Sequence, residues 1–371
     1  MFKILFVVNN PDFFLSHRVK IALAAKEKGY DVHVATMQGE SVKVIESLGL
    51  KHHVLMMSRS GTNPLSELKS LFSLYRLFKR VKPDLVHLVT IKPVLYGGIA
   101  ARLARVPAVV YAISGLGFIF IRQKKGVDFL KGLIKYLYRI ALGHTHSRVI
   151  FQNKDDCATL MQMGAVQSQQ VVMIRGAGVD MEEFAPTLNE PPLPIKVTMV
   201  ARLLKDKGVQ EFVEAAKLDV EKKFVWQIAG GIDTGNPASI TQAEFNNMQS
   251  YVNMLGERKD IAQLYAQSHI VVLPSYREGI PKSLLEAAAS GKPIITTDVP
   301  GCRDAIIPDE SGLLVPVKNA PAIYEAVMYL AHRADLRLSM GKAGRALAER
   351  EFAMPIIIDK HLAVYQALLE K

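Results

Sequence analysis

Residues 4–36 read ILFVVNNPDFFLSHRVKIALAAKEKGYDVHVAT, and this stretch decides the fold of the first half of the chain. Its apolar runs Ile4–Val8 and Val32–Thr36 predict two buried strands. Between them, Ser16–Lys28 has helical spacing and stops at Gly29. Strand, helix and strand in this order are typical of a βαβ unit with parallel strands. We therefore expect the chain to open with a doubly wound α/β domain.

The same alternation continues along the chain. Further strands are predicted at His53–Met56, Leu85–Val89, Ala108–Ala112 and Arg148–Phe151, with helices at Leu65–Arg80 and Val94–Arg105. The prolines of residues 189–194 (NEPPLP) predict a linker, because proline disfavours both helix and central strand. After it, strands are predicted at Ile195–Val200, Phe224–Ala229, Ile270–Pro274 and Ile294–Thr297. This pattern predicts an α/β fold of two facing Rossmann-like domains, 1–188 and 189–352, with a C-terminal helix at 353–371 that packs back on the first domain.

Composition excludes several classes of protein. The chain has 371 residues, of which 49% are hydrophobic and 22% charged, as in an ordinary two-domain globular protein. Its two cysteines, Cys157 and Cys302, lack metal-ligand spacing and predict neither a disulfide framework nor a zinc site. No run of about 20 apolar residues suggests a membrane span, and a buried first strand explains the N-terminus better than a signal peptide. We expect a cytoplasmic protein.

The positive charge is concentrated in the first half. Residues 1–185 contain 25 Lys and Arg against 13 Asp and Glu, a net charge of +12, whereas the remainder contains 21 against 22, a net charge of −1. Such asymmetry predicts an anionic partner for the first half: a membrane surface, a phosphorylated lipid or nucleic acid.

The strongest local motif is residues 275–289, SYREGIPKSLLEAAA, a loop with glycine and proline between a buried strand and a helix. Pro281 suits the first turn of that helix, whose free N–H groups and positive dipole end can hold a phosphate. Glu286 lies further along, where a carboxylate can accept two hydrogen bonds from ribose hydroxyls. The alternative is that Glu278 and Glu286 are solvated surface residues, but the apolar neighbours of Glu286 argue against it.

Glu278 and Glu286 are spaced as in the Glu-x7-Glu motif of retaining glycosyltransferases of family 4, which the chain resembles along nearly its whole length. Residues 200–208, VARLLKDKG, resemble the family's Gly-Arg-x4-Lys-Gly segment, whose Arg and Lys hold the donor diphosphate. Residues 299–304, VPGCRD, resemble the loop after the following strand, and residues 310–316 resemble the closing hairpin. The resemblance implies the GT-B fold of two facing Rossmann-like domains.

Arg202 and Lys207 also suit this chemistry on their own. Breaking a sugar–phosphate bond leaves negative charge on the diphosphate, and no acidic ligand cluster is apparent that would hold a divalent cation there. Two fixed cations can replace the metal. We therefore expect no cofactor and no metal. The alternative is that these are two solvated basic residues at the start of a helix.

The loops of the first domain depart from the family pattern. Residues 9–18 contain no glycine where many relatives have a glycine-rich turn; their polar residues resemble the variant of bacterial O-antigen and lipid-linked oligosaccharide transferases. His17 is a candidate catalyst there, with a helix-capping role as the alternative. His87 matches the first of two histidines in many relatives, but Val89 stands in place of the second, so Thr90 or Lys92 is expected to replace it. The segment Thr90–Pro93, with Ser114–Phe118, is similar to the undecaprenyl-diphosphate-linked bacillosamine N-acetylgalactosaminyltransferases.

Residues 118–142 combine apolar residues at helical spacing with basic side chains and one acid, Asp128. The apolar spacing allows a helix that faces the core. The one-signed charge favours an interfacial helix on anionic lipids instead. Leu65–Lys82 repeats the pattern. The expected membrane contacts are Phe118, Arg122, Lys124, Lys125, Lys131, Lys135 and Arg139.

The resemblance implies a retaining hexosyltransferase, which we expect to work without a metal because Arg202 and Lys207 can replace one. It would move a hexose or N-acetylhexosamine, with N-acetylgalactosamine as the best guess, from a UDP-sugar to a polyprenyl-diphosphate-linked glycan at the inner face of the plasma membrane. The alternatives are a non-hydrolysing UDP-sugar 2-epimerase and a non-catalytic binder of anionic lipid or nucleic acid, although no nucleic-acid-binding motif is apparent. The expected catalytic residues are His17, Arg202, Lys207 and Glu278. The expected donor contacts are Gly231, Gly279, Ile280, Pro281, Lys282, Ser283 and Glu286. The expected acceptor contacts are Asn9, Asn10, Ser16, Thr90, Lys92, Ser114 and Gly115.

Overall fold

The computed structural model describes residues 1–57, 64–116 and 127–370, and the chain divides into two compact units. Unit 1 consists of Met1–Ala177 and Pro355–Lys371, and unit 2 of Gly178–Met354. The boundary after Ala177 therefore precedes the predicted linker at residues 189–194. The residues between this boundary and the linker belong to unit 2, because Val179 and Phe184 pack in its core and Arg345 Nη1 donates to the Phe184 carbonyl at 3.1 Å.

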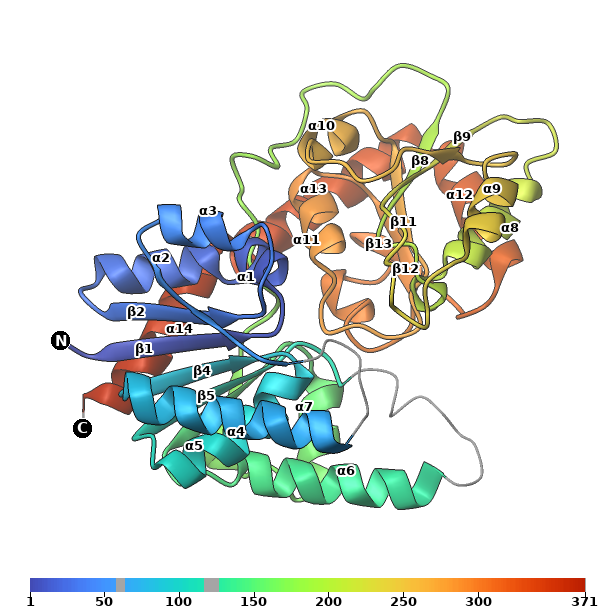
Figure 1. Cartoon of the computed structure of the whole chain (residues 1–371). Coiled ribbons are helices and arrows are strands. Elements are labelled where there is room, and N and C mark those ends of the chain that lie inside the picture. The colour runs from blue at the N-terminus through green and yellow to red at the C-terminus, as the bar shows by residue number, and fades with distance from the viewer. Residues whose placement is uncertain (58–63, 117–126, 371) are drawn as a thin grey trace. The chain divides into compact units, whose positions relative to one another are not determined.

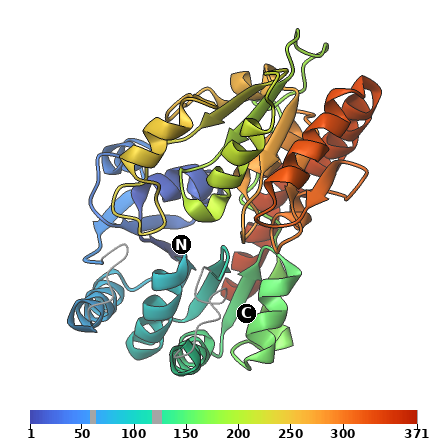
Figure 2. The same ribbon diagram turned by 90° about the vertical axis from the view of Figure 1, so that its right-hand side faces the viewer.

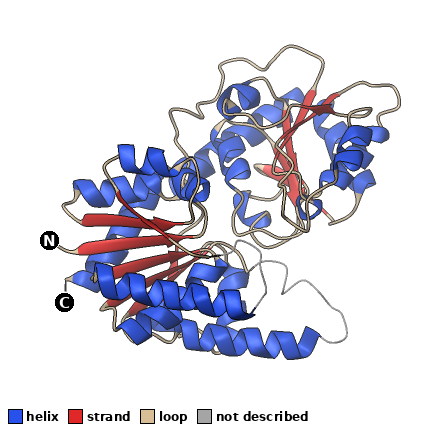
Figure 3. Ribbon diagram, in the orientation of Figure 1, coloured by secondary structure: helices blue, strands red, loops and turns tan. Residues whose placement is uncertain are grey.

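Unit 1 is built on a seven-stranded parallel sheet in the order β3-β2-β1-β4-β5-β6-β7. The strands are β1 (Lys3–Val8), β2 (Asp31–Thr36), β3 (Lys51–Val54), β4 (Leu85–Val89), β5 (Ala108–Ile113), β6 (Ser147–Phe151) and β7 (Val171–Met173). Helices cover both faces of the sheet (Figure 3). The central strands are accordingly rich in apolar residues and buried on both sides, with buried polar residues such as His87 among them.

The helices of unit 1 include three neighbours, α4, α5 and α6, that lie next to one another. The helices of the unit are α1 (Pro11–His17), α2 (Val19–Glu27), α3 (Val42–Ser47), α4 (Pro64–Val81), α5 (Gly98–Ala104) after a π-helical turn (Pro93–Gly97), α6 (Val127–Leu142), α7 (Lys154–Gln162) before a 3-10 turn (Ser168–Gln170), and α14 (Met354–Leu369). Figures 1 and 2 show α4, α5 and α6 side by side on one face of the sheet.

The helix predicted over Ser16–Lys28 is wrong in its bounds. The structure has two helices, α1 and α2, which meet at Arg18. Arg18 leaves the helical region (φ −131°) and its guanidinium is buried, with Nη1 donating to the His17 carbonyl at 2.9 Å. The break turns a charged side chain inward, which a hydrophobic pattern cannot anticipate.

Helix α14 is part of unit 1 although it follows unit 2 in the sequence. Its residues Ile357, Tyr365 and Leu368 are buried in the same core as strand β1. The hydroxyl of Tyr365 lies 2.6 Å from Nδ1 of His87 on β4. Burial holds the pKa of His87 well below its usual range, so the imidazole is neutral and shares one hydrogen bond with the Tyr365 hydroxyl through Nδ1. The last helix is thus joined to the centre of the first sheet.

Unit 2 contains a six-stranded parallel sheet in the order β10-β9-β8-β11-β12-β13. The strands are β8 (Lys196–Val200), β9 (Val225–Ala229), β10 (Asn253–Met254), β11 (Ile270–Leu273), β12 (Ile294–Thr297) and β13 (Gly312–Val315). The helices are α8 (Val209–Lys217), α9 (Gln242–Met248), α10 (Ile261–Ala266), α11 (Lys282–Ala289), α12 (Ala320–Ala331) and α13 (Ala334–Glu351), with 3-10 turns at Lys205–Lys207 and Arg303–Ala305.

The hairpin expected at residues 310–316 is also wrong. Strand β13 runs parallel to β12, with Ile294 opposite Gly312 and Thr297 opposite Val315. A parallel partner needs a long connection, and here residues 298–311 provide it. The predicted α/β class is confirmed, since both units are Rossmann-like layers of helices on a parallel sheet.

The contact between α14 and β4 makes a stability prediction. Tyr365→Phe keeps the buried ring but leaves Nδ1 of His87 without its hydrogen-bond partner, which should lower the free energy of unfolding by about 1–3 kcal/mol. Urea unfolding of the full chain measures it, with Tyr329→Phe, at an exposed tyrosine, as the control. A Tyr365→Phe midpoint equal to that of the control would contradict the assigned hydrogen bond.

Candidate active site

Four loops of unit 2 follow neighbouring parallel strands, β9, β8, β11 and β12. Because the strands are parallel, the loops that follow them leave the sheet at one edge, where open α/β sheets bind ligands. The loops are residues 230–240, 201–208, 274–281 and 298–305. All predicted donor and catalytic residues of the second half lie in these loops or in α11.

Two glycines allow these loops to touch through their backbones. A Cβ on Gly208 (φ +75°) would lie 2.2 Å from the Pro274 carbonyl oxygen, and one on Gly301 (φ +82°) would lie 2.1 Å from that of Gly279. Hydrogen bonds cross the same contacts: Tyr276 N–H donates to the Asp206 carbonyl at 2.9 Å. No residue with a side chain fits at either glycine without moving a neighbouring loop.

The predicted cations each meet a carboxylate. Lys207 Nζ pairs with Glu278 Oε1, which also accepts from Ser275 Oγ at 2.9 Å. Both charged side chains of this pair are largely buried. Arg202, at the surface, pairs through Nη1 with Asp233 Oδ2 at 2.5 Å. The structure therefore brings Lys207 and Glu278 together and leaves Arg202 on a partner that the sequence did not predict.

Glu286 lies inside helix α11. Its side chain is buried, and Oε1 lies 3.1 Å from Lys282 Nζ one turn earlier. Burial raises the pKa of Glu286, and the neighbouring ammonium of Lys282 opposes that shift. Pro281 is the N-cap of the helix, one position before the predicted first turn. Gly279 and Ile280 belong to the preceding loop, Lys282 and Ser283 form the first turn, and Gly231 lies in the loop after β9.

Two acids at this edge were missed by sequence reasoning. Asp233 follows Gly231 by two positions, and Asp206 lies between Arg202 and Lys207. Asp206 is buried, which raises the pKa of its carboxyl against the lowering effect of Lys207. The sequence contained one signal for these two acids, namely that each lies close to a residue predicted to contact the donor.

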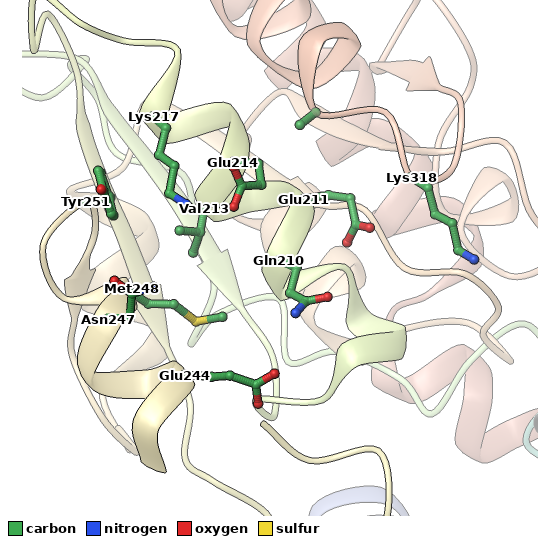
Figure 4. A pocket seen from close by; sticks show the side chains of 11 residues that line it. Gln210, Glu211, Val213, Glu214, Lys217, Glu244, Asn247, Met248, Tyr251 and Lys318 are labelled. Atoms are coloured by element: carbon green, nitrogen blue, oxygen red, sulfur yellow. Dashed lines mark hydrogen bonds and ion pairs between the residues drawn. The ribbon is translucent and has the colours of Figure 1, made fainter. Parts of the chain in front are cut away.

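A cavity of about 410 Å³ lies between α8, α9 and the loop before α12 (Figure 4). Its walls include Glu211, Glu244, Tyr251 and Lys318 but none of the predicted donor residues. Tyr276 links the two places, since its hydroxyl donates to Glu211 Oε1 at 2.6 Å. The predicted donor residues of unit 2 thus gather at the strand ends rather than in this cavity.

The predicted acceptor residues of unit 1 also follow neighbouring strands. Asn9 and Asn10 follow β1, Thr90 and Lys92 follow β4, and Ser114 and Gly115 follow β5. Val8, Val89 and Ala112 are partners in the sheet register, so the three loops begin side by side.

Two of these loops hold polar atoms in unusual settings. Thr90 has φ +73°, which is rare for a β-branched residue and marks a strained backbone. Among the described residues, neither Thr90 Oγ1 nor Ser114 Oγ has a hydrogen-bond partner, although both atoms are buried. Lys92 is tied to Glu67 at 2.7 Å, and Val89 is buried in the core. Thr90 and Lys92 thus differ in their surroundings, and the replacement of the second histidine by one of them stays a prediction.

The N-terminal polar residues form a capped helix. Asn10 Oδ1 accepts from Phe13 N–H at 2.9 Å, as an N-cap does. His17 ends the same helix, stacked on Phe13 with ring centroids 4.0 Å apart, and its Nδ1 lies 2.7 Å from Ser16 Oγ. Both the capping and the catalytic interpretation of His17 are compatible with this partly exposed position.

Much of the predicted membrane segment is outside the described residues. This is the case for Phe118, Arg122, Lys124 and Lys125, and for the side chain of Lys131. In the described part of α6, Tyr138, Ala141 and Leu142 are buried in the core, whereas Lys135 and Arg139 are exposed. This end of the helix therefore faces the core with its apolar side.

Helix α4, by contrast, exposes apolar side chains. Leu65, Leu68 and Phe72 are 72%, 63% and 53% exposed. Arg76 lies over the Phe72 ring, 4.7 Å from its centroid. The helix carries one acid, Glu67, whose largely buried side chain pairs with Lys92. The exposed residues Leu65, Leu68, Phe72 and Arg76 thus combine apolar side chains with a basic one, and we call this face the outer stripe of α4.

Two further properties concern the described residues alone. In that part of the chain no helix is long and apolar enough to cross a membrane. The same residues contain no group of three or more His, Cys, Asp or Glu side chains arranged to hold a metal ion.

Known proteins resemble the chain along its whole length. The family model "Glycosyl transferases group 1" matches residues 180–347, and "Glycosyl transferase 4-like" matches residues 3–153. The N,N'-diacetylbacillosaminyl-diphospho-undecaprenol alpha-1,3-N-acetylgalactosaminyltransferase of Campylobacter jejuni is 32% identical over 96% of this chain and 98% of its own. The UDP-Gal:alpha-D-GlcNAc-diphosphoundecaprenol alpha-1,3-galactosyltransferase of Escherichia coli is 31% identical over 71% of this chain and 70% of its own.

Solved structures share the fold at lower identity. The sucrose-phosphate synthase of Thermosynechococcus elongatus superposes with a TM-score of 0.80 at 18% identity, covering 100% of both chains. Anabaena HepE in complex with UDP and glucose superposes with a TM-score of 0.77 at 18% identity, covering 99% of this chain and 100% of its own. These structures show the GT-B fold. The family models and the two relatives confirm the prediction of an enzyme, rather than of a non-catalytic binder, and show that the chain belongs to the family 4 glycosyltransferases.

Proposed function

We propose that this glycosyltransferase moves an N-acetylhexosamine or hexose, with N-acetylgalactosamine as the first candidate, from a UDP-sugar to a glycan on a polyprenyl diphosphate. The observation that carries the proposal is the grouping of Arg202, Lys207 and Glu278 with helix α11 at the carboxyl edge of the second sheet. The Campylobacter relative, named as an N-acetylgalactosaminyltransferase on a diphospho-undecaprenol acceptor, supports the choice of sugar and acceptor.

In this proposal the donor lies with its ribose on Glu286 and its diphosphate on Arg202, Lys207 and the N-terminus of α11. The buried carboxylate of Glu286 accepts from the two ribose hydroxyls. The free N–H groups of the helix and the two cations neutralise the diphosphate without a metal ion. HepE, which was solved with UDP and glucose, supports a nucleotide ligand in this fold.

The transfer keeps the anomeric configuration. The bond between the anomeric carbon and the diphosphate oxygen breaks, and its electron pair stays on UDP. The acceptor hydroxyl oxygen bonds to the same face of the anomeric carbon, and its proton passes to the leaving diphosphate. Glu278 hydrogen-bonds the sugar hydroxyls, and the fixed charges of Arg202 and Lys207 stabilise the departing anion.

In unit 1 we assign the acceptor to the loops after β1, β4 and β5. The hydroxyls of Thr90 and Ser114, which have no hydrogen-bond partner among residues 1–57, 64–116 and 127–370, offer hydrogen bonds to a glycan. His17 remains the candidate to contact the reacting hydroxyl. The test of the whole proposal is transfer from a panel of nucleotide sugars to synthetic polyprenyl-diphosphate glycans. A protein that consumes UDP-sugars without an acceptor would instead be an epimerase or hydrolase.

We further propose that the outer stripe of α4 rests on the anionic inner face of the plasma membrane, where the lipid-linked acceptor is reached. Leu65, Leu68 and Phe72 would enter the interface while Arg76 and Lys79 meet lipid phosphates. Each basic side chain near such a surface contributes about 1 kcal/mol.

Substitution of Glu286 tests the ribose contact. Glu286→Ala should weaken UDP binding by about 1.5–3 kcal/mol, because a hydrogen-bonded charged acceptor is lost. Calorimetry with UDP measures it, and Glu325→Ala, at an exposed glutamate of α12, serves as control. Equal affinities in the two variants would refute the ribose assignment.

The two cations should matter more for turnover than for donor affinity. Arg202→Ala and Lys207→Ala should each lower kcat by on the order of a hundredfold, since negative charge develops on the diphosphate as the bond breaks. Steady-state kinetics at saturating donor measure this, with Lys342→Ala on α13 as control. Near-normal kcat in either variant would count against its assigned role.

The α4 surface predicts selective loss of membrane binding. Changing Leu65, Leu68 and Phe72 together to Ser should release the protein from anionic liposomes without unfolding it, because all three side chains are exposed. The matched control changes three exposed apolar residues of unit 2, Leu218, Val220 and Leu338, to Ser. Liposome sedimentation that falls equally in both triple variants, or in neither, would contradict the assignment.

A further inference from the structure

The four loops after β9, β8, β11 and β12, together with α11, form what we call the donor edge of unit 2. Asp233 belongs to it, and none of the roles above uses this carboxylate. Its side chain is 8% exposed, whereas that of its partner Arg202 is 54% exposed. The pair is therefore asymmetric. The carboxylate is held in the protein, and the guanidinium would otherwise move freely in solvent. A bond of 2.5 Å from Nη1 to Oδ2 restrains it.

Asp233 is positioned independently of that ion pair. Its own N–H donates to Ser239 Oγ at 3.1 Å, and Asn236 Nδ2 donates to Oδ2 at 3.3 Å. The two loops themselves are joined by backbone bonds, from Leu203 N–H to the Gly231 carbonyl at 3.0 Å and from Lys205 N–H to the Ala238 carbonyl at 2.8 Å. The loop geometry should thus survive loss of the Asp233 carboxylate.

The arrangement leaves Arg202 able to bind a second anion. A guanidinium has five N–H donors, and the bond to Asp233 uses one of them, on Nη1. The other donors can hold oxygens of a diphosphate while the side chain stays in one orientation. A cation fixed before the reaction needs no reorganisation when charge develops on the leaving group.

We propose that Asp233 is a positioning residue that orients the guanidinium of Arg202 toward the leaving diphosphate. The inference rests on the proposed function, in which Arg202 stabilises that group. It differs from a competing role, in which Asp233 would occupy Arg202 until UDP displaced it. Competition predicts tighter UDP binding when the carboxylate is removed, and positioning predicts slower turnover.

The test compares Asp233→Ala and Asp233→Asn in the full chain, alone and with Arg202→Ala. Asp233→Ala should lower kcat by about tenfold to a hundredfold, as loss of an orienting partner does elsewhere, with a much smaller change in UDP affinity. Asp233→Asn should recover part of kcat, because its amide oxygen still accepts a hydrogen bond. With Arg202→Ala already present, Asp233→Ala should cause no further loss. The surface pair Arg258–Asp260 supplies the control, Asp260→Ala.

Each other outcome has a distinct meaning. Tighter UDP binding by Asp233→Ala would overturn the inference in favour of competition. Equal losses of kcat with and without Arg202 would overturn it in favour of a loop-stabilising role. A wild-type protein that binds no UDP would overturn the proposed function itself, and the inference with it.

Discussion

The donor edge of unit 2 depends on the contact of loop against loop at two glycines. Gly208 lies against Pro274, and Gly301 against Gly279, at distances that exclude a Cβ atom. These contacts hold the segment that carries Lys207 against the segment that carries Glu278. Charged side chains on separate loops would usually lose orientation in solvent. Here short, interlocked backbones limit that freedom, which is what a site built from loops requires.

The packing of these loops also brings side chains of opposite charge together. Cations of the edge pair with carboxylates: Arg202 meets Asp233, Lys207 meets Glu278, and Lys282 meets Glu286. Such pairs compensate the desolvation of side chains that are partly buried before any ligand arrives. A nucleoside diphosphate would bring negative charge to the same cations. Glu278 and Glu286 would then be available to accept hydrogen bonds from hydroxyls of the donor, whereas Asp233 would stay on Arg202.

Sequence reasoning succeeded where one local signal determined the structure. Strands β4 and β12 are buried along their whole length and rich in apolar and β-branched residues, so both were predicted at their observed bounds. It failed where contacts between distant residues determine the structure. Arg18 breaks a helix because its side chain turns inward. The three-residue strand β7 exists only as an edge partner of β6. Asp233 was missed for the same reason, since its contact with Arg202 spans two loops. The roles of the predicted site residues remain predictions.

The central claim is that the strand ends of unit 2 hold the nucleoside diphosphate of the donor. A crystal structure of the full chain with UDP tests it most directly. The account predicts both ribose hydroxyls within hydrogen-bond distance of the Glu286 carboxylate, and the diphosphate on Arg202, Lys207 and the N-terminus of α11. UDP bound elsewhere, for example in the cavity beside Glu211 and Tyr251, with Glu286 still paired only to Lys282, would contradict it.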